Sequence, residues 1–204
     1  MFDYRRFWSV DETLTRGAFR VHILGRDYDE LRAVEKGELE PTQPLRFHHD
    51  QGSRLKDVIG TTSATLLFSD RFVAVLAGGG FSGWRTYPVE VFDAHGDIVP
   101  GYHGLVVTGG SGPLVDSLSP VMEAPPFIQG GEVPLLRIGI RFHPESWDGS
   151  DVFCPSGTTY TLVTQEVRDA LVAAKVTNLD LKRITEIETL VYGAELDEYE
   201  RRRQ

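Results

Sequence analysis

The stretch LLFSDRFVAVLAGGGFSGWRTYPVEVF, Leu66 to Phe92, is the most clearly patterned part of this chain. A short apolar strand opens it, and Ser69 follows as a helix N-cap whose hydroxyl can accept a hydrogen bond from a backbone N–H of the first turn. The apolar spacing over residues 70–79 predicts an amphipathic helix, and its closing glycines predict a left-handed stop. Alternating residues over 84–92 predict another strand. The stretch therefore predicts one strand–helix–strand unit.

A second segment repeats this pattern after a constant offset in the chain. The N-cap Ser69 aligns with Thr164, and the core position Leu76 aligns with Leu171, without a gap between them. Caps and apolar core positions are those that the physics of a helix constrains most. We therefore interpret residues 162–184 as a second copy of the unit, arising from a duplication.

Two copies predict a fold of the α+β class, with a mixed β-sheet and helices on one face, built around two similar strand–helix–strand units. A helix between two strands indicates a parallel pair joined by a right-handed crossover. Two repeats are too few for a solenoid, so we expect both in one domain. We divide the chain into a segment 1–60 packed on the main domain, the duplicated domain 61–190 and a charged tail 191–204.

The composition is that of a globular protein with a core. The chain has 204 residues, of which 41% are hydrophobic and 25% charged, and its net charge is −9. This acidic balance disfavours a nucleic-acid partner, because such partners need basic patches. No apolar run is long enough to span a membrane, and the start of the chain does not resemble a secretory signal. We expect a cytoplasmic protein.

Cys154 is the single cysteine, so an internal disulfide and a cysteine-based zinc site are excluded. We interpret it as a small, buried residue at the end of a strand rather than as a catalytic thiol, because its neighbours do not suggest a lowered pKa. The glycine cluster 108–113 lacks the spacing of a phosphate-binding loop, and we interpret it as a turn or linker.

Histidines and carboxylates supply one alternative. His48, His143 and Glu145 each follow a strand-like segment, so they could converge on a metal ion in a small hydrolase. They do not have the spacing of a known metal motif. We do not expect an enzyme, a cofactor or a metal site.

The loop 143–151 holds our candidates for binding a partner. Three carboxylates surround one tryptophan in it: Glu145, Asp148 and Asp151 beside Trp147. An exposed tryptophan beside acidic residues is typical of a binding hot spot. Together with the loops 93–103 and 109–134, which lie between the two copies, this loop is where we expect partner selection.

The pattern from Leu55 to Glu186 resembles the type 11 immunity proteins of bacterial polymorphic toxin systems, a family first described as a domain of unknown function. The segments that carry the resemblance are Phe68 to Phe72 and the glycine step Gly80 to Gly83. In the second copy, residues 175–178 depart from that glycine step. The resemblance implies a cytoplasmic protein that binds and neutralises a cognate toxin, and it assigns no functional residues.

Three functions are therefore considered. The first is an immunity protein whose acidic surface covers a toxin, with electrostatic attraction guiding the encounter. The second is the metal-dependent hydrolase of His48, His143 and Glu145. The third is a regulatory module that associates with itself through the repeat.

Overall fold

The computed structural model describes residues 2–35, 37–63, 65–126, 128–131 and 133–191. The described residues are mainly strands, which form three mixed or antiparallel sheets, with three short α-helices. The predicted α+β class is confirmed. None of the helices in these ranges is long and apolar enough to cross a membrane. The predicted tail lies, from residue 192 onward, outside the described residues.

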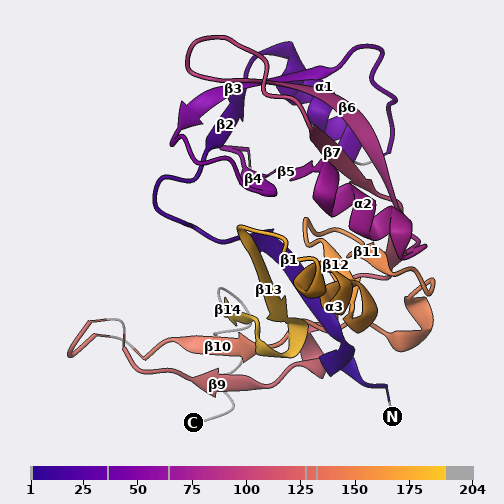
Figure 1. Cartoon of the computed structure of the whole chain (residues 1–204). Coiled ribbons are helices and arrows are strands. Elements are labelled where there is room, and N and C mark those ends of the chain that lie inside the picture. The colour runs from indigo at the N-terminus through magenta and orange to yellow at the C-terminus, as the bar shows by residue number, and fades with distance from the viewer. Residues whose placement is uncertain (1, 36, 64, 127, 132, 192–204) are drawn as a thin grey trace.

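A six-stranded sheet forms the upper half of the molecule in Figure 1, in the order β2-β3-β6-β7-β5-β4. Its strands are β2 (Arg20–Ile23), β3 (Leu45–Gln51), β4 (Val58–Gly60), β5 (Leu66–Ser69), β6 (Trp84–Phe92) and β7 (Tyr102–Val107). Isolated bridges join Val21 to Thr61 and Ala18 to Arg54. The first and last strands therefore meet, and the sheet curls toward a closed barrel.

The inner face of this sheet is an apolar core. Leu31 and Val34 of helix α1 (Arg26–Glu35) are buried in it, together with Phe47, Leu67 and Tyr87. Successive strand residues point to opposite faces of a sheet. Phe68, which follows Leu67, therefore points away from this core and is buried in the apolar cluster on the outer face of the sheet.

The lower half contains a five-stranded sheet in the order β13-β1-β12-β11-β8 and a three-stranded sheet in the order β14-β10-β9. The first comprises β1 (Phe7–Glu12), β8 (Gly109–Ser111), β11 (Val152–Pro155), β12 (Leu162–Thr164) and β13 (Leu179–Arg183). The second comprises β9 (Val121–Glu123), β10 (Leu135–Ile138) and β14 (Glu188–Leu190). Short 3-10 helices lie at η1 (Tyr4–Arg6), η2 (Asp116–Leu118), η3 (Pro144–Ser146) and η4 (Ile184–Glu186). In Figure 1 the chain between β9 and β10 projects away from the body.

In each strand–helix–strand unit, the two strands lie on either side of a third, antiparallel strand that is not part of the unit. Strand β7 lies between β5 and β6, and β1 lies between β12 and β13. The two strands of each unit therefore run parallel to each other, as predicted, but they are not paired directly. In the first unit the enclosed strand follows along the chain, whereas in the second it comes from the N-terminus.

Helices α2 (Asp70–Gly78) and α3 (Gln165–Ala173) join the halves through one shared core. Phe72 and Leu76 of α2 and Val167 and Leu171 of α3 are buried in the same apolar cluster. Helix α1 packs in the inner core of the six-stranded sheet, and α2 packs against that sheet's other face. The helices are thus not gathered on one face as predicted, because the two larger sheets have apolar residues on both sides.

The N-terminal segment is woven into both halves. Strand β1 is a central strand of the lower sheet, while β2, α1, β3 and β4 belong to the upper half. The division we placed after residue 60 falls between β4 and β5, which pair with each other.

Candidate functional site

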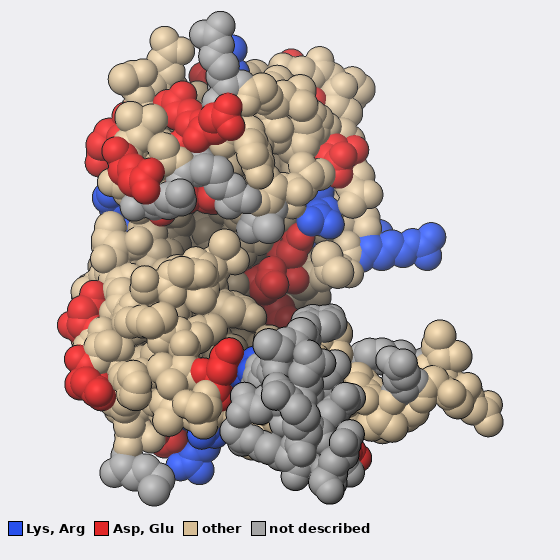
Figure 2. Space-filling model, turned by 180° about the vertical axis from the view of Figure 1, so that it is seen from behind, with Lys and Arg blue, Asp and Glu red and all other residues tan. Residues whose placement is uncertain are grey.

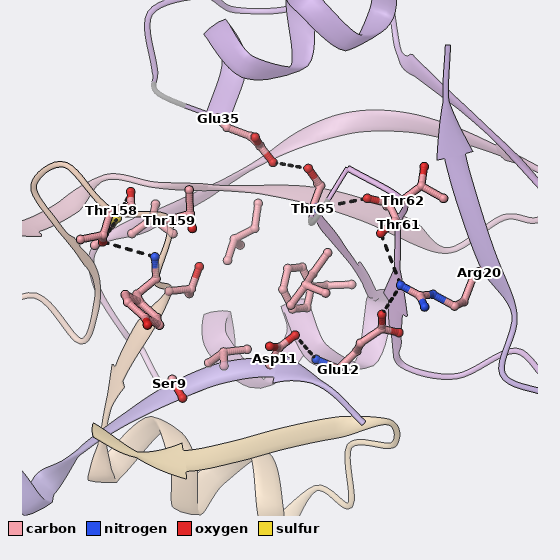
Figure 3. Close-up of a pocket in the computed structure, with 18 of the residues that line it drawn as sticks. Ser9, Asp11, Glu12, Arg20, Glu35, Thr61, Thr62, Thr65, Thr158 and Thr159 are labelled. Atoms are coloured by element: carbon pink, nitrogen blue, oxygen red, sulfur yellow. Dashed lines mark hydrogen bonds and ion pairs between the residues drawn. The ribbon is translucent and has the colours of Figure 1, made fainter. Parts of the chain in front are cut away.

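A cleft of about 950 Å³ lies between the two halves. Residues of β1, β2, α1 and β3 line it, together with those of the β4–β5 turn and the segment that leads into β12 (Figure 3). Its wall holds four carboxylates and one guanidinium, from Asp11, Glu12, Glu35, Asp50 and Arg20. Figure 2 shows acidic side chains inside the hollow between the halves. This cleft is our candidate site, because binding sites are usually concave and combine apolar with a few polar lining residues.

Glu12 and Arg20 form the buried ion pair of this cleft. Their charged groups lie 2.6 Å apart, and the Glu12 side chain is 8% exposed. Burial raises the pKa of Glu12, while the charge of Arg20 opposes that rise. The carboxylate packs directly on Gly60, where an added Cβ would lie 1.8 Å from Glu12 Oε1. A side chain at position 60 would therefore displace the Glu12 carboxylate from its present place.

Hydroxyl groups tie the upper wall of the cleft together. Thr65 Oγ1 donates a hydrogen bond to Glu35 Oε1 at 2.6 Å, and the Thr65 backbone N–H donates to Thr61 Oγ1 at 3.1 Å. Thr61 Oγ1 is also 2.8 Å from Ser63 Oγ. This network holds the Glu35 carboxylate of α1 against the β4–β5 turn, because Thr65, which binds Glu35, is itself fixed by Thr61 (Figure 3).

The opposite wall carries Cys154 and a run of threonines. Cys154 is half-buried on β11, and its sulfur lies 3.5 Å from the Thr158 carbonyl oxygen. Burial raises the pKa of the thiol, so the neutral form is favoured. A neutral, hydrogen-bonded thiol agrees with a packing role better than with a nucleophile.

The cleft suits a ligand that carries positive charge. Its lining includes the apolar side chains of Leu66, Phe68 and Leu105 together with carboxylate and hydroxyl groups. One guanidinium cannot neutralise the charge of four carboxylates. An extended segment with lysine or arginine side chains would match both the apolar and the acidic residues of this lining.

The predicted hot spot in the loop 143–151 has a different environment from the one we expected. Trp147 is half-buried, its ring packs edge-on against Phe7 with centroids 5.1 Å apart, and its Nε1 donates to the Ser150 carbonyl oxygen at 3.1 Å. Asp148 accepts a hydrogen bond from the Gly110 backbone N–H at 2.8 Å. Trp147 is therefore part of the core of the lower half, and Asp148 holds β8 in place.

The other two residues of that loop are also engaged within the chain. Asp151 Oδ2 accepts hydrogen bonds from the backbone N–H and the hydroxyl of Ser82, both at 2.9 Å. Glu145 is exposed and lies 3.8 Å from His143. None of these loop residues is among those that line the cleft.

The structure does not bring together the residues of the metal-hydrolase alternative. His48 lies on β3 of the upper half and stacks on Phe92 with centroids 5.1 Å apart. His143 and Glu145 lie at η3 in the lower half. Among the described residues, no group of three or more histidine, cysteine, aspartate or glutamate side chains could hold a metal ion.

Sequence reasoning missed the cleft because its charged residues come mainly from the first 51 positions. These residues lie in different elements, with Asp11 and Glu12 on β1, Arg20 on β2 and Glu35 on α1, and no spacing marks them as a set. The threonine-rich turn around 61–65 was the one local signal, since clustered hydroxyls mark turns that bond their own backbone.

Comparison with known proteins adds no relative. No protein-family model matches this chain, and a search of curated proteins gave no match. The resemblance to type 11 immunity proteins therefore remains an expectation.

Proposed function

We propose that this chain is a binding protein that neutralises a cognate bacterial toxin, acting as a cytoplasmic immunity protein. The observation that carries the proposal is the acidic cleft between the halves, in which Asp11, Glu12, Glu35 and Asp50 outnumber Arg20. The net charge of −9 and the resemblance of the core pattern to immunity proteins agree with it.

In this proposal a basic segment of the toxin enters the cleft and is thereby kept from its own substrate. The Glu12–Arg20 pair and the Glu35–Thr65 hydrogen bond keep the acidic wall in place before the toxin arrives. A preformed site loses little entropy on binding. The negative electrostatic potential of an acidic cleft increases the rate of association with a basic partner. The chain then acts by occupation, without chemistry of its own.

The experiment is protection of cells by co-expression with the toxin encoded beside this chain, together with a binding measurement on purified proteins. The variant Asp11→Lys/Asp50→Lys reverses two exposed charges of the cleft. We expect a loss of affinity of about a hundredfold or more and a strong decrease in association rate, because like charges now meet.

The matched control is Asp97→Lys. Asp97 is exposed in the turn after β6 and does not line the cleft, so it changes the charge without changing the site. Binding that survives in Asp11→Lys/Asp50→Lys and is lost in Asp97→Lys would move the interface to the loop 93–103. Failure of the unaltered chain to bind or protect would refute the proposed function.

A further inference from the structure

Two histidines face each other on neighbouring strands of the six-stranded sheet. His22 of β2 and His48 of β3 are directly opposite in the antiparallel register, and their ring centroids lie 6.0 Å apart. Strands β2 and β3 lie side by side in the upper half (Figure 1). Residues directly opposite on two such strands have Cβ atoms about 5 Å apart, so the two imidazoles belong to one small patch of the surface.

This histidine pair lies on the outer face of the sheet. The neighbouring residues Val21, Ile23 and Phe47 are buried in the inner core. Because successive strand residues point to opposite faces, His22 and His48 point away from that core. Both side chains are partly exposed, so a dissolved ion can reach their rings.

The ring nitrogens of the pair are not engaged by the described part of the chain. His49 Nε2 lies 2.7 Å from a backbone carbonyl oxygen, and His103 Nε2 lies 2.6 Å from the Asp70 carboxylate. Within the described residues, the rings of His22 and His48 have no such hydrogen-bond partner. A neutral imidazole has one nitrogen that donates and one that accepts, so each ring of the pair keeps a lone pair for a ligand.

The separation of the two rings suits a single metal ion. A histidine nitrogen binds zinc at about 2 Å, which places the ring centre about 3 Å from the ion, so two rings on one ion have centres about 5–6 Å apart. The 6.0 Å between His22 and His48 is at the upper end of that range. Rotation of one ring closes the remaining difference, while the strands keep their register.

Phe92 of β6 restricts the His48 ring from its other side. The two rings stack with centroids 5.1 Å apart and an angle of 13° between their planes. In the sheet, β3 lies between β6 and the end strand β2. His48 is therefore the fixed member of the pair, and His22 is the one that adjusts. A ligand that is held in place before the ion arrives loses less entropy on binding.

The charged side chains near the pair leave a negative balance. Two guanidiniums flank it, and each has a carboxylate partner: Arg20 lies 2.6 Å from Glu12, and Arg46 lies 3.8 Å from Glu90. Asp50 is on the same face of β3 as Arg46, is exposed, and has no ion pair within the described ranges. The carboxylate that is left over favours a cation at this place.

We propose that His22 and His48 together bind one divalent transition-metal ion, Cu²⁺ or Zn²⁺, with water completing the coordination. Imidazole is a common ligand of both ions, and copper binds such a site more tightly. The ion links β2 to β3 and so fastens the end strand of the sheet. This site is distinct from the metal-hydrolase alternative, which combined His48 with residues of the lower half, and it is independent of the toxin-binding proposal.

The test is isothermal titration calorimetry of the untagged full chain with Cu²⁺ and, separately, with Zn²⁺. Mg²⁺ is the reference, because it prefers oxygen ligands and should not bind. We expect saturable binding of both transition metals, tighter for Cu²⁺. Electron paramagnetic resonance of the copper form should show two coordinated ring nitrogens. The absence of saturable binding, or a spectrum with one ring nitrogen, overturns the proposal.

His22→Asn and His48→Asn each remove one ligand and keep a polar side chain at the surface. We expect each variant to bind Cu²⁺ about a hundredfold more weakly, because the second ligand of a chelate acts at a high effective concentration. The matched control is His95→Asn, an exposed residue in the turn after β6, which should bind as the unaltered chain does. Equal affinity in His22→Asn and His95→Asn overturns the proposal.

The double variant His22→Asn/His48→Asn distinguishes a chelate from two separate histidines. A chelate is lost with its first ligand, so the double variant should bind only slightly more weakly than either single variant, whereas separate sites would give additive losses. Thermal unfolding supplies a second measurement. Zn²⁺ should raise the Tm of the unaltered chain, because the ion binds the folded state preferentially, and should leave that of the double variant unchanged. Additive losses of affinity, or an equal rise of Tm in both chains, contradict the proposed site.

Discussion

The two strand–helix–strand units follow the same backbone path with different residues. Each begins at an N-cap in extended conformation, Ser69 in the first and Thr164 in the second, and continues into an α-helix of nine residues. After the first helix, Gly80 and Gly83 have φ values of +65° and +87°. The path is retained in the second unit, although its residues at these places are not glycine.

Lys175 and Asn178 take the positions of those glycines, with φ values of 54° and 59°. The departure from the glycine step seen in the sequence therefore does not change the turn. It adds strain, because a side chain in the left-handed region costs about 1–2 kcal/mol, less for asparagine. Asn178 is also anchored by a hydrogen bond from Nδ2 to the Val58 carbonyl oxygen at 2.8 Å. The comparison teaches that tertiary contacts can maintain a turn that glycine would form at lower cost.

One carboxylate precedes each unit in the sequence and forms hydrogen bonds with residues of both units. Asp57 accepts hydrogen bonds from the Ser69 hydroxyl at 2.8 Å and from the hydroxyl and backbone N–H of Thr177 at 2.7 and 2.8 Å. Ser69 caps the first helix and Thr177 follows the second. Asp57 therefore fastens the two units to each other.

Asp151 makes the reciprocal connection. It accepts from Ser82, which follows the first helix, and from Thr164, which precedes the second, although the latter contact is 3.4 Å long. The two carboxylates hold equivalent places, but Asp57 is bound more tightly. This reciprocity agrees with the predicted duplication, which stays a prediction.

The largest effect we expect is from the shared core. Leu76→Ala and Leu171→Ala each remove a side chain that is fully buried in the same cluster, so each should lower the free energy of unfolding by about 3 kcal/mol. Urea unfolding measures both. Because the two side chains share one cluster, the double variant should lose an amount that differs from the sum. Strict additivity would mean that the halves unfold as separate cores.

Next in size is the difference between the two carboxylates. Asp57→Asn should destabilise by about 2 kcal/mol and Asp151→Asn by about 1 kcal/mol, since more and shorter hydrogen bonds to a charged acceptor are lost at Asp57. Thermal unfolding of both variants under one condition checks the order. An equal loss would show that the long contact of Asp151 with Thr164 is worth as much as the short ones.

The pH dependence should follow Asp57. Burial raises the pKa of this carboxyl, but hydrogen bonds from Thr177 and Ser69 outweigh burial, and the net pKa lies below its ordinary value. The stabilisation is therefore present above the unfolded pKa and is lost as the pH falls through the folded one. The stability difference between the unaltered chain and Asp57→Asn should shrink over that acidic range. A difference that stays constant down to the lowest pH contradicts this account.

The smallest effect concerns the left-handed turns. Lys175→Gly should stabilise the chain by about 0.5–1 kcal/mol because it relieves strain at a positive φ, while the exchange Gly80→Lys should destabilise it by a similar amount. Equilibrium unfolding of these two variants sharpens the comparison between the units. If Lys175→Gly is destabilising, the lysine side chain contributes a contact that outweighs its strain.

Local pattern predicted the two units well, and failed where residues meet only through the fold. The two helices and their start at Ser69 and Thr164 followed from hydroxyl and apolar spacing, which act within one turn of the chain. The hydroxyl cap was correct for Ser69 and wrong for Thr164, whose side chain makes no cap hydrogen bond and donates to Asp151 instead. Trp147 was interpreted as an exposed anchor because its neighbours in sequence are acidic, whereas it packs against Phe7 at the other end of the chain. Neighbours in sequence do not predict such burial.

The sequence by itself determined the strand–helix–strand units, the α+β class and the acidic balance, because these depend on short-range hydrogen bonding, periodicity and composition. Only the tertiary structure decided that β1 completes the second unit and that Glu12 meets Arg20 in the cleft between the halves. These groups lie far apart along the chain or in different elements, and long-range pairing depends on the summed packing of the whole core rather than on local residue preference.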